Sequence, residues 1–200
     1  MGKWMKKFNI LKEISETSQS NQAINNYHII EYYYTEGHIL KMEQFKMNDK
    51  NKFTYTMETE DGTITETTYS HKINDNEYIG TTYIENGDNK TVRENEKINR
   101  ELFKDSVLYS ADTKDLLKYS LDATIKTTTF RNTECYYINN FPILTGGKYE
   151  RVYFDKVTGL MIGSSQVDSS QNSATPIEAV YEYNVVTDKD FIEPDISNYK

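Results

Sequence analysis

Length, composition and charge already exclude several classes of protein. The chain has 200 residues, the length of one large domain, and a formal charge of -8 at pH 7. An acidic chain lacks the basic face that nucleic-acid binding requires, and an anionic membrane surface does not attract it electrostatically. With 17 Tyr and 8 Phe the sequence has enough large side chains to build a core, so we expect a folded protein.

The N-terminal residues predict an amphipathic helix within residues 1–20. Trp4, Phe8, Leu11 and Ile14 follow one another at spacings of four, three and three, which places them on one face of a helix. Such a face is stable when it is covered, so we expect the helix to pack on another element. A stretch rich in Ser, Asn and Gln then ends the helical pattern before the first strand.

The next part of the chain has the two-residue period of antiparallel strands. In one of these strands Phe53, Tyr55 and Met57 alternate with polar residues, and Asp61-Gly62 supplies a tight turn after it. Asn86-Gly87 is a second hairpin signal. The pattern predicts a meander with strands over residues 28–34, 39–47, 53–58, 64–68, 77–84 and 90–94. The strand over residues 64–68 is more polar, so we expect it near an edge.

The pattern becomes helical again over residues 98–122. Asp112 is placed to cap a helix that contains Leu116, Leu117 and Leu121. A shorter helical turn precedes it, so this region predicts two short helices. Strand patterns then return over residues 124–139, 149–155, 160–167 and 179–186.

The sequence lacks the residue patterns of common catalytic and metal sites. His28, His38 and His71 lie on separate predicted strands or strand ends, without HxH or HExxH spacing. Cys135 is the single cysteine and lies inside a strand, which favours a buried, inert thiol over a reactive one. The sequence also has neither a GxSxG elbow nor a phosphate-binding loop. We therefore expect a protein that is not an enzyme and that needs no metal or other cofactor.

The last third of the chain resembles a known family. It contains Cys-Tyr-Tyr-Ile at residues 135–138 and a strand that ends in Asp-Lys-Val-Thr-Gly-Leu at residues 155–160. A final tyrosine-rich strand is followed by Phe191, Pro194 and Asp195. These segments are similar to the last strands of the LolA/LolB lipoprotein-carrier fold, whose relatives include periplasmic sigma-factor regulators and mycobacterial lipoproteins. The order of elements extends the resemblance over most of the chain, but the N-terminus shows neither the export signal nor the lipid anchor that relatives normally carry.

The resemblance implies an α+β fold with a strongly curved antiparallel sheet, that is, an incomplete barrel. An N-terminal helix and a short helical insertion would cover its concave face. Residues 1–200 would form a single LolA-like half-barrel domain, with the helix at residues 1–20 and a helical lid at residues 98–122. In that family the concave face is apolar and holds acyl chains or an apolar peptide. Burial of about a dozen methylenes would contribute several kcal/mol at roughly 25 cal/mol per Å².

The implied function is that of a non-catalytic, monomeric binding protein. Its partner would be an apolar small molecule or lipid, a lipoprotein acyl chain, an apolar peptide or another envelope protein. The candidate lining residues are Tyr32, Tyr34, Phe53, Tyr55, Met57, Leu116, Leu117, Leu121, Val152, Phe154, Tyr181 and Tyr183. The same residues would serve equally as ordinary core. In that alternative the chain is a protein–protein interaction or regulatory scaffold of the bacterial envelope with a filled core.

The expected location follows from the same resemblance. No stretch of the sequence reaches the roughly 18 to 20 apolar residues of a membrane-spanning helix. We expect an extracytoplasmic protein of the cell envelope if a signal peptide or lipid anchor has been removed, and a cytoplasmic one if the N-terminus is native.

Overall fold

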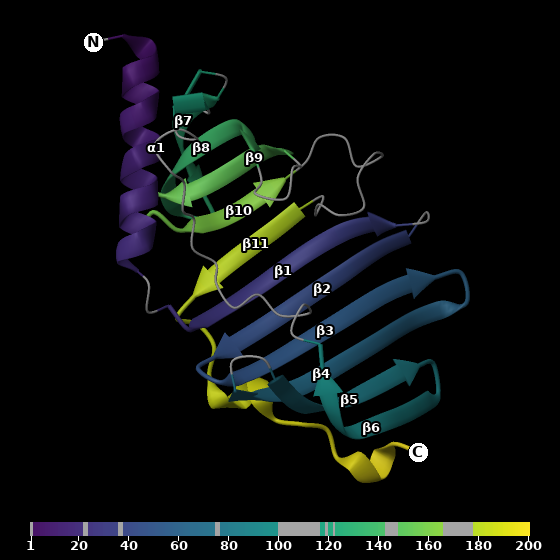
Figure 1. Cartoon of the computed structure of the whole chain (residues 1–200). Coiled ribbons are helices and arrows are strands. Elements are labelled where there is room, and N and C mark those ends of the chain that lie inside the picture. The colour runs from purple at the N-terminus through teal and green to yellow at the C-terminus, as the bar shows by residue number, and fades with distance from the viewer. Residues whose placement is uncertain are drawn as a thin grey trace. The chain divides into compact units, whose positions relative to one another are not determined.

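The structure, a computed structural model, contains an N-terminal helix and an eleven-stranded antiparallel sheet (Figure 1). It describes residues 2–21, 24–35, 38–74, 77–99, 117–118, 120–121, 123–142, 148–165 and 178–200. The chain groups into two compact units. Unit 1 comprises Met1–Ala23 and Ser106–Val180, and unit 2 comprises Ile24–Asp105 and Tyr181–Lys200.

The elements follow the sequence pattern closely. The helix α1 spans Lys3–Ser20. The strands are β1 Asn26–Thr35, β2 His38–Met47, β3 Lys50–Thr59, β4 Gly62–Asn74, β5 Glu77–Asn86, β6 Asn89–Ile98, β7 Thr124–Phe130, β8 Thr133–Pro142, β9 Lys148–Asp155, β10 Met161–Ser165 and β11 Glu178–Tyr183. Two short 3-10 helices, Asp188–Phe191 and Ile196–Asn198, follow in the C-terminal segment. The α+β class, the N-terminal helix and the antiparallel strands are therefore confirmed.

The strand order leaves the sheet open. Hydrogen-bonded neighbours follow the order β6-β5-β4-β3-β2-β1-β11-β10-β9-β8-β7, so β6 and β7 are its two ends. The strands of unit 2 pair in almost continuous register, with shifts only at Lys72/Asn74 and Gly80/Thr82. Strong curl requires repeated bulges or glycine kinks. The described strands accordingly are neither closed nor strongly curled, and the predicted strongly curved half-barrel is wrong in this respect.

Strand β4 lies in the interior of the sheet, which corrects the prediction that it is near an edge. It pairs with β3 on one side and with β5 on the other. Its threonines find partners across both strand pairs: Thr67 Oγ1 lies 3.3 Å from Thr54 Oγ1, and Thr68 Oγ1 lies 3.0 Å from Thr82 Oγ1. A polar strand can therefore be central when its hydroxyls pair across strands.

In unit 1, α1 contributes one side of a hydrophobic core. Leu11 and Ile14 are buried together with Ala123, Ile138, Val152 and Phe154, and Phe8 packs against this cluster. Trp4, which belongs to the same predicted helical stripe, is 46% exposed. The apolar stripe of the helix is thus covered by β8 and β9, as Leu11 and Ile14 show, but not over its first turn.

The Asp155–Leu160 segment holds the C-terminal end of α1 in place. Asp155 Oδ1 accepts hydrogen bonds from the amides of Val157 and Thr158, each at 2.7 Å, which fixes the turn between β9 and β10. The carbonyl oxygen of Thr158 accepts a hydrogen bond from Asn21 Nδ2 at 2.8 Å. Gly159 has φ of +65°, and a Cβ there would lie 2.7 Å from the carbonyl oxygen of Ile14. The motif that carries the resemblance therefore docks a helix as well as forming a turn.

A turn within residues 124–139 escaped the sequence analysis. Arg131 and Asn132 both have positive φ, 47° and 68°, and separate β7 from β8 as a two-residue hairpin loop. These angles are those of a type I′ turn, which usually contains Gly. Because neither residue is Gly, the pattern indicated one continuous strand region where there are two strands.

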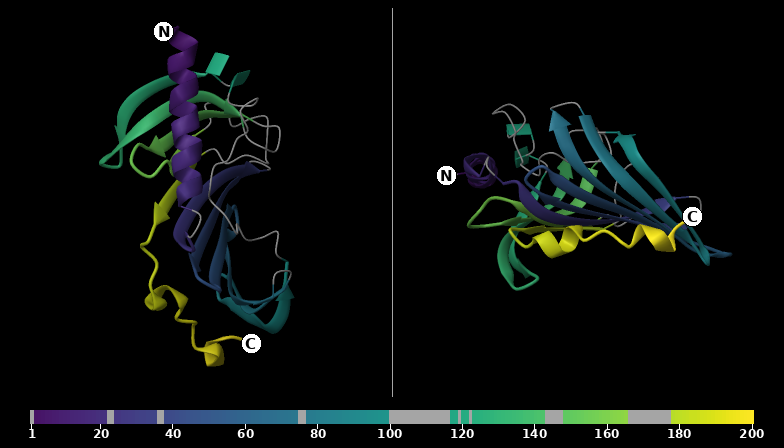
Figure 2. Two further views of the ribbon diagram at one scale, coloured as in Figure 1. Left: turned by 60° about the vertical axis from the view of Figure 1, so that its left-hand side comes forward. Right: turned by 90° about the horizontal axis from the view of Figure 1, so that it is seen from below.

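The C-terminal segment packs along unit 2, where it follows the yellow trace in Figure 2. Tyr199 donates a hydrogen bond to Glu85 at 2.7 Å, and its ring meets the ring of Tyr83 edge to face. The amide of Lys200 donates to the carbonyl oxygen of Lys90 at 3.0 Å.

Candidate functional site

The strand register of unit 2 defines its two faces, because directly paired residues of an antiparallel sheet point to the same side. One face, here called the Phe53 face, carries Leu40, Met42, Gln44, Lys46, Asn51, Phe53, Tyr55, Met57, Ile64, Glu66, Thr68 and Ser70. The opposite face, here called the Phe45 face, carries His28, Lys41, Glu43, Phe45, Lys52, Thr54, Thr56, Thr67 and Tyr69.

Five of the predicted lining residues share the Phe53 face. Phe53, Tyr55 and Met57 alternate along β3. Tyr181 joins them, since its hydroxyl donates to Glu31, whose β2 partner is Met42. Tyr183 follows two residues later on β11 and so points to the same side. Burial raises the pKa of Tyr183, so this hydroxyl stays protonated.

Tyr32, another of the predicted lining residues, lies on the other face. It pairs with Lys41, which pairs with Thr56, and Thr56 alternates with Tyr55 and Met57. A two-residue period cannot show which side of one strand faces which side of the next, so sequence reasoning joined two sets that the register separates. The backbone of Tyr34 pairs with Ile39, but its side chain lies outside the described part of the structure.

Val152 and Phe154, also predicted to line the site, lie in unit 1. They are 0% and 1% exposed in the core of unit 1, where they are clustered with Leu11 and Ile14 of α1. Their apolar surface is already covered by helix side chains, so they do not line an open site. Most of the predicted lid, residues 98–122, lies outside the described residues, as does Leu116. Leu117 and Leu121 are described and are 43% and 68% exposed.

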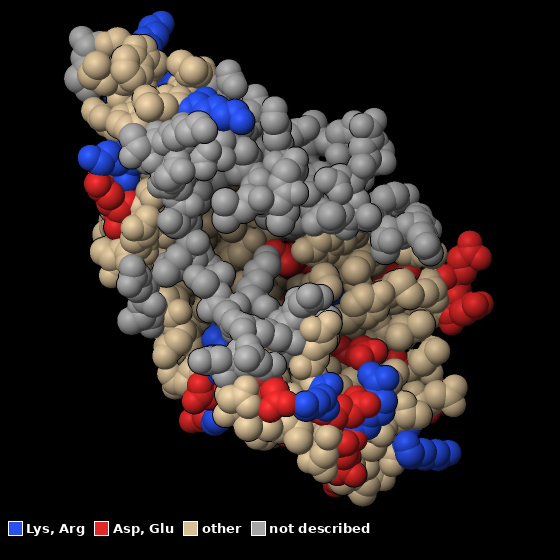
Figure 3. All heavy atoms as spheres, viewed as in Figure 1, with Lys and Arg blue, Asp and Glu red and all other residues tan. Residues whose placement is uncertain are grey.

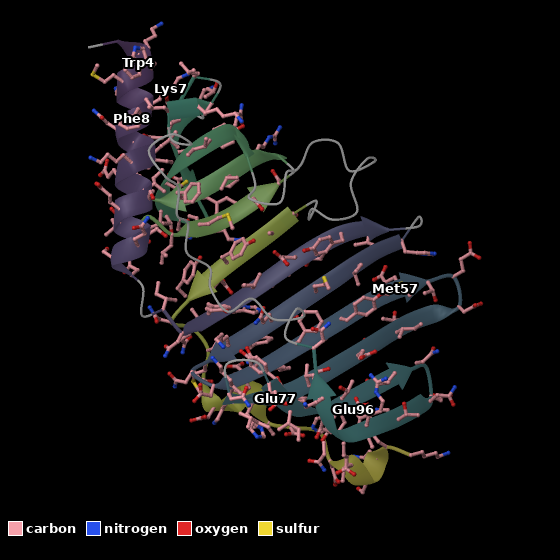
Figure 4. The ribbon with its side chains drawn as sticks, viewed as in Figure 1. Trp4, Lys7, Phe8, Met57, Glu77 and Glu96 are labelled. Carbon is pink, nitrogen blue, oxygen red and sulfur yellow. The ribbon has the colours of Figure 1, made fainter. Side chains whose placement is uncertain are left out.

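The Phe53 face has an apolar end and a polar end. Two direct cross-strand rows supply the apolar end: Leu40 with Met57 and Ile64, and Met42 with Tyr55, the second of which is flanked by Glu31 on β1 and Glu66 on β4. Figure 4 labels Met57 on β3, toward its turn into β4. Most of these side chains are half-buried rather than fully covered. Figure 3 shows acidic side chains gathered beyond this end, where Glu58, Glu60 and Asp61 of the β3–β4 hairpin are exposed.

The same face holds buried charged residues that sequence analysis missed. Glu31 is 6% exposed and accepts hydrogen bonds from the hydroxyls of Tyr33 and Tyr181, at 3.0 and 3.1 Å. Lys46 is also 6% exposed, with its Nζ 6.0 Å from the centre of the buried Tyr78 ring. In the sequence, each of them is a charged residue at a strand position where the alternation places apolar side chains, and this was the signal that could have identified them. The face is therefore amphipathic rather than uniformly apolar.

A charged cluster occupies the opposite face. His28 Nε2 lies 2.8 Å from Glu43 Oε1, and His28 Nδ1 lies 2.9 Å from Glu182 Oε2. Burial alone would lower the pKa of His28, but its hydrogen bonds to the two carboxylates outweigh burial and raise it. The hydrogen bond from His28, against burial and with help from Lys41, lowers the pKa of Glu43 to about 2. With both ring nitrogens on carboxylates, His28 is an imidazolium that ties β11 to β1 and β2.

A pocket of about 380 Å³ lies beside the C-terminal segment in unit 2. Its lining residues are Lys50, Asn51, Tyr69, Ser70, His71, Ile79, Gly80, Thr81, Asn95, Phe191 and Glu193. The charged groups of this lining already have partners. Lys50 pairs with Asp188 at 2.7 Å, and Glu193 accepts a hydrogen bond from Tyr83 at 2.8 Å. These pairs hold the C-terminal segment on the strands, which is a structural role.

The described residues offer no metal centre and no activated thiol. Within the described ranges, no group of three or more His, Cys, Asp or Glu side chains could hold a metal ion. Cys135 is buried, and burial raises the pKa of its thiol. No helix among the described residues is long and apolar enough to cross a membrane.

Comparison with known proteins identified no relative of this chain. No protein-family model matches this chain, and no curated protein matches it either. The likeness to the LolA/LolB fold therefore extends, as far as the structure shows, to an N-terminal helix with an antiparallel sheet.

Proposed function

We propose that this chain is a non-catalytic binding protein that holds an apolar ligand against the Phe53 face of unit 2. The ligand is a lipid, a lipoprotein acyl chain or an apolar peptide, and the proposal includes a location in the cell envelope. The observation that carries it is the apolar end of this face. There Leu40, Met57 and Ile64 are direct cross-strand neighbours, beside the pair Met42 and Tyr55.

The chemistry of the face suits an amphipathic ligand with an apolar chain. Half-buried Met and Tyr side chains supply adaptable apolar contacts, because Met has a flexible, polarisable thioether and Tyr has an apolar ring with a polar tip. On the same face, the buried Glu31 is the β1 partner of Met42 and so lies beside the apolar end, whereas the buried Lys46 lies toward the polar end. Burial of the ligand's apolar chain would supply the binding energy, and the polar end of the face would orient the ligand.

Native mass spectrometry of the purified protein, before and after incubation with a total bacterial lipid extract, tests the proposal. We expect a discrete adduct of lipid mass that Met57→Glu weakens at least about tenfold, because a carboxylate would then meet the apolar chain. Thr56→Glu is the matched control, since it places the same charge on the neighbouring position of β3 but on the Phe45 face. A bare protein mass in every spectrum, or equal losses in both variants, would contradict the proposal.

One observation favours a second function, that of a protein–protein interaction or regulatory scaffold. In the described part of unit 1, Val152 and Phe154 are buried against Leu11 and Ile14. A scaffold needs a rigid, packed interior and not a ligand cavity. If lipid extract leaves the mass of the protein unchanged, co-purification of an envelope protein that Met57→Glu still retains would support this function.

A further inference from the structure

The outer face of β7, β8 and β9 in unit 1 carries a set of cationic and hydroxyl side chains. Lys126 pairs across the strands with Tyr137, and Tyr137 pairs with Tyr153. Arg151 precedes Tyr153 by two residues and so shares this face. These residues line a pocket of about 300 Å³ together with Thr127 and Thr128. Figure 1 shows the three strands side by side.

Lys126 and Arg151 have no carboxylate partner among the described residues, although the chain as a whole carries a charge of -8. The pocket lining itself contains no acid. Asp155, on the same face, already accepts hydrogen bonds from the amides of Val157 and Thr158. Glu178 pairs with Ser165, which pairs with Arg151, so its backbone is two strands, or roughly 10 Å, from that of Arg151. Among the described residues, neither cation therefore forms an ion pair.

Two of the remaining lining residues, Tyr137 and Tyr153, have hydroxyl groups on packed aromatic rings. The Tyr137 and Tyr153 rings lie 5.4 Å apart, and Phe130 stacks on Tyr153 with ring centres 4.4 Å apart. Gly163 lies directly beneath Phe130, because a Cβ at this glycine would be 2.7 Å from the Phe130 ring. Burial raises the pKa of Tyr153, so its hydroxyl is a donor at neutral pH. The aromatic packing thus positions the Tyr137 and Tyr153 rings in the lining that also contains the two cations.

We propose that this pocket, which we call the Arg151 pocket, binds a doubly charged oxyanion of the phosphate type. A guanidinium and an ammonium can only donate, and a planar guanidinium matches two phosphate oxygens at once. Two positive charges complement the two negative charges of a dianion more fully than the single negative charge of a carboxylate. The oxyanion is either free inorganic phosphate or a phosphate monoester on a larger molecule. This site lies within unit 1 and does not depend on the function proposed for the Phe53 face.

Amide chemical-shift titration of the full chain tests the assignment, with inorganic phosphate, methyl phosphate and acetate as separate probes. We expect saturable shifts at the amides of Tyr137, Arg151 and Tyr153 with the phosphate probes, and at least tenfold weaker binding of acetate. Tighter binding of methyl phosphate assigns the site to a phosphate monoester, and tighter binding of inorganic phosphate assigns it to the free ion. Added salt should weaken the binding of both phosphate probes, as it weakens any partly exposed charge pair.

A pair of arginine variants separates a built site from general attraction. Arg151→Gln should weaken phosphate binding at least tenfold, the loss expected for a charge-assisted hydrogen bond. Arg93→Gln removes the same charge from unit 2, where Arg93 is paired with Glu66 and Glu96, and should leave the affinity unchanged. The amide spectrum itself reports whether each variant is folded. Absence of saturable shifts, equal binding of acetate, or equal losses in both variants would overturn the assignment.

Discussion

Gly159 is a residue at which an added methyl group meets the backbone of α1. Its φ is +65°, and a Cβ would lie 2.7 Å from the Ile14 carbonyl oxygen and 2.8 Å from the Ser18 amide nitrogen. Gly159→Ala should therefore lower the free energy of unfolding by roughly 2 to 4 kcal/mol, through left-handed strain and overpacking together. Urea denaturation of the two proteins measures this difference.

Gly87 provides the matched control for that experiment. Its φ is +58°, but a Cβ there would meet no atom within 4 Å. Gly87→Ala should cost only the left-handed strain, about 1 to 2 kcal/mol. Equal losses at the two positions would show that α1 does not pack tightly over the Asp155–Leu160 turn.

His28 makes the stability of unit 2 depend on pH. Its pKa is raised above 6.5 in the folded state, so its contribution is complete below pH 6.5 and is lost as pH rises through the folded pKa. The pKa of Glu43 is lowered from 4.5 to about 2, so its contribution is complete above pH 4.5 and is lost as pH falls toward 2. Both contributions are complete together only between about pH 4.5 and 6.5.

We therefore predict that His28→Gln removes a pH-dependent part of the stability. At pH 6 the variant should be less stable by roughly 1 to 2 kcal/mol, because two charge-assisted hydrogen bonds are replaced by weaker neutral ones. Above the folded pKa of His28 the difference between the proteins should shrink. Urea denaturation at a series of pH values from 5 to 9 measures it, and a difference that stays constant across this range would refute the imidazolium assignment.

At the scale of elements, the helix α1 depends on its middle rather than on its first turn. Leu11 is 0% exposed within the core of unit 1, whereas Trp4 is 46% exposed. Leu11→Ala should lower the free energy of unfolding by about 2 to 5 kcal/mol, the usual cost of a cavity in a packed core. Trp4→Ala should change it by less than about 0.5 kcal/mol, as surface substitutions do. Thermal or urea unfolding followed by circular dichroism compares them, and a larger loss for Trp4→Ala would contradict the packing of the stripe.

The strands β1 to β6 illustrate how local signals combine into an element. Gly62 and Gly87 have positive φ at the two glycine turns that the sequence predicts. Local turn chemistry thus determined the hairpins. It did not determine whether a strand lies at an edge, because β4 is polar yet central, with its threonines paired on both sides.

At the scale of the whole molecule, the two units have separate hydrophobic clusters. Phe154 lies in a cluster with α1 in unit 1, and Phe53 with Tyr78 forms a cluster in unit 2. We predict that Phe154→Ala accelerates hydrogen exchange of amides in β8 and β9 and leaves that of β2 to β4 unchanged, because local openings follow cooperative units. Mass spectrometry of hydrogen exchange makes the comparison. A uniform acceleration over both units would show that the chain unfolds as one cooperative body.

The sequence by itself determined the elements and part of the candidate site. The helical spacing of Leu11 and Ile14, the alternation of Phe53 with Met57 and the glycine turns all depend on residues close together in the chain. Cys135 was also predicted to be buried, and it is 0% exposed. Periodicity and turn chemistry are local properties, so a single sequence contains them in full.

Only the tertiary structure decided which residues meet. The register places Tyr32 and Tyr55 on different faces of the sheet. The docking of α1 buries Val152 and Phe154, and β11 lies between β1 and β10 in the strand order. These outcomes depend on long-range pairing, in which a shift of one residue exchanges the two faces of a strand. The buried Glu31 and the cations of the Arg151 pocket belong to the same class, because a charged residue in an alternating strand acquires its role from neighbours distant in the sequence.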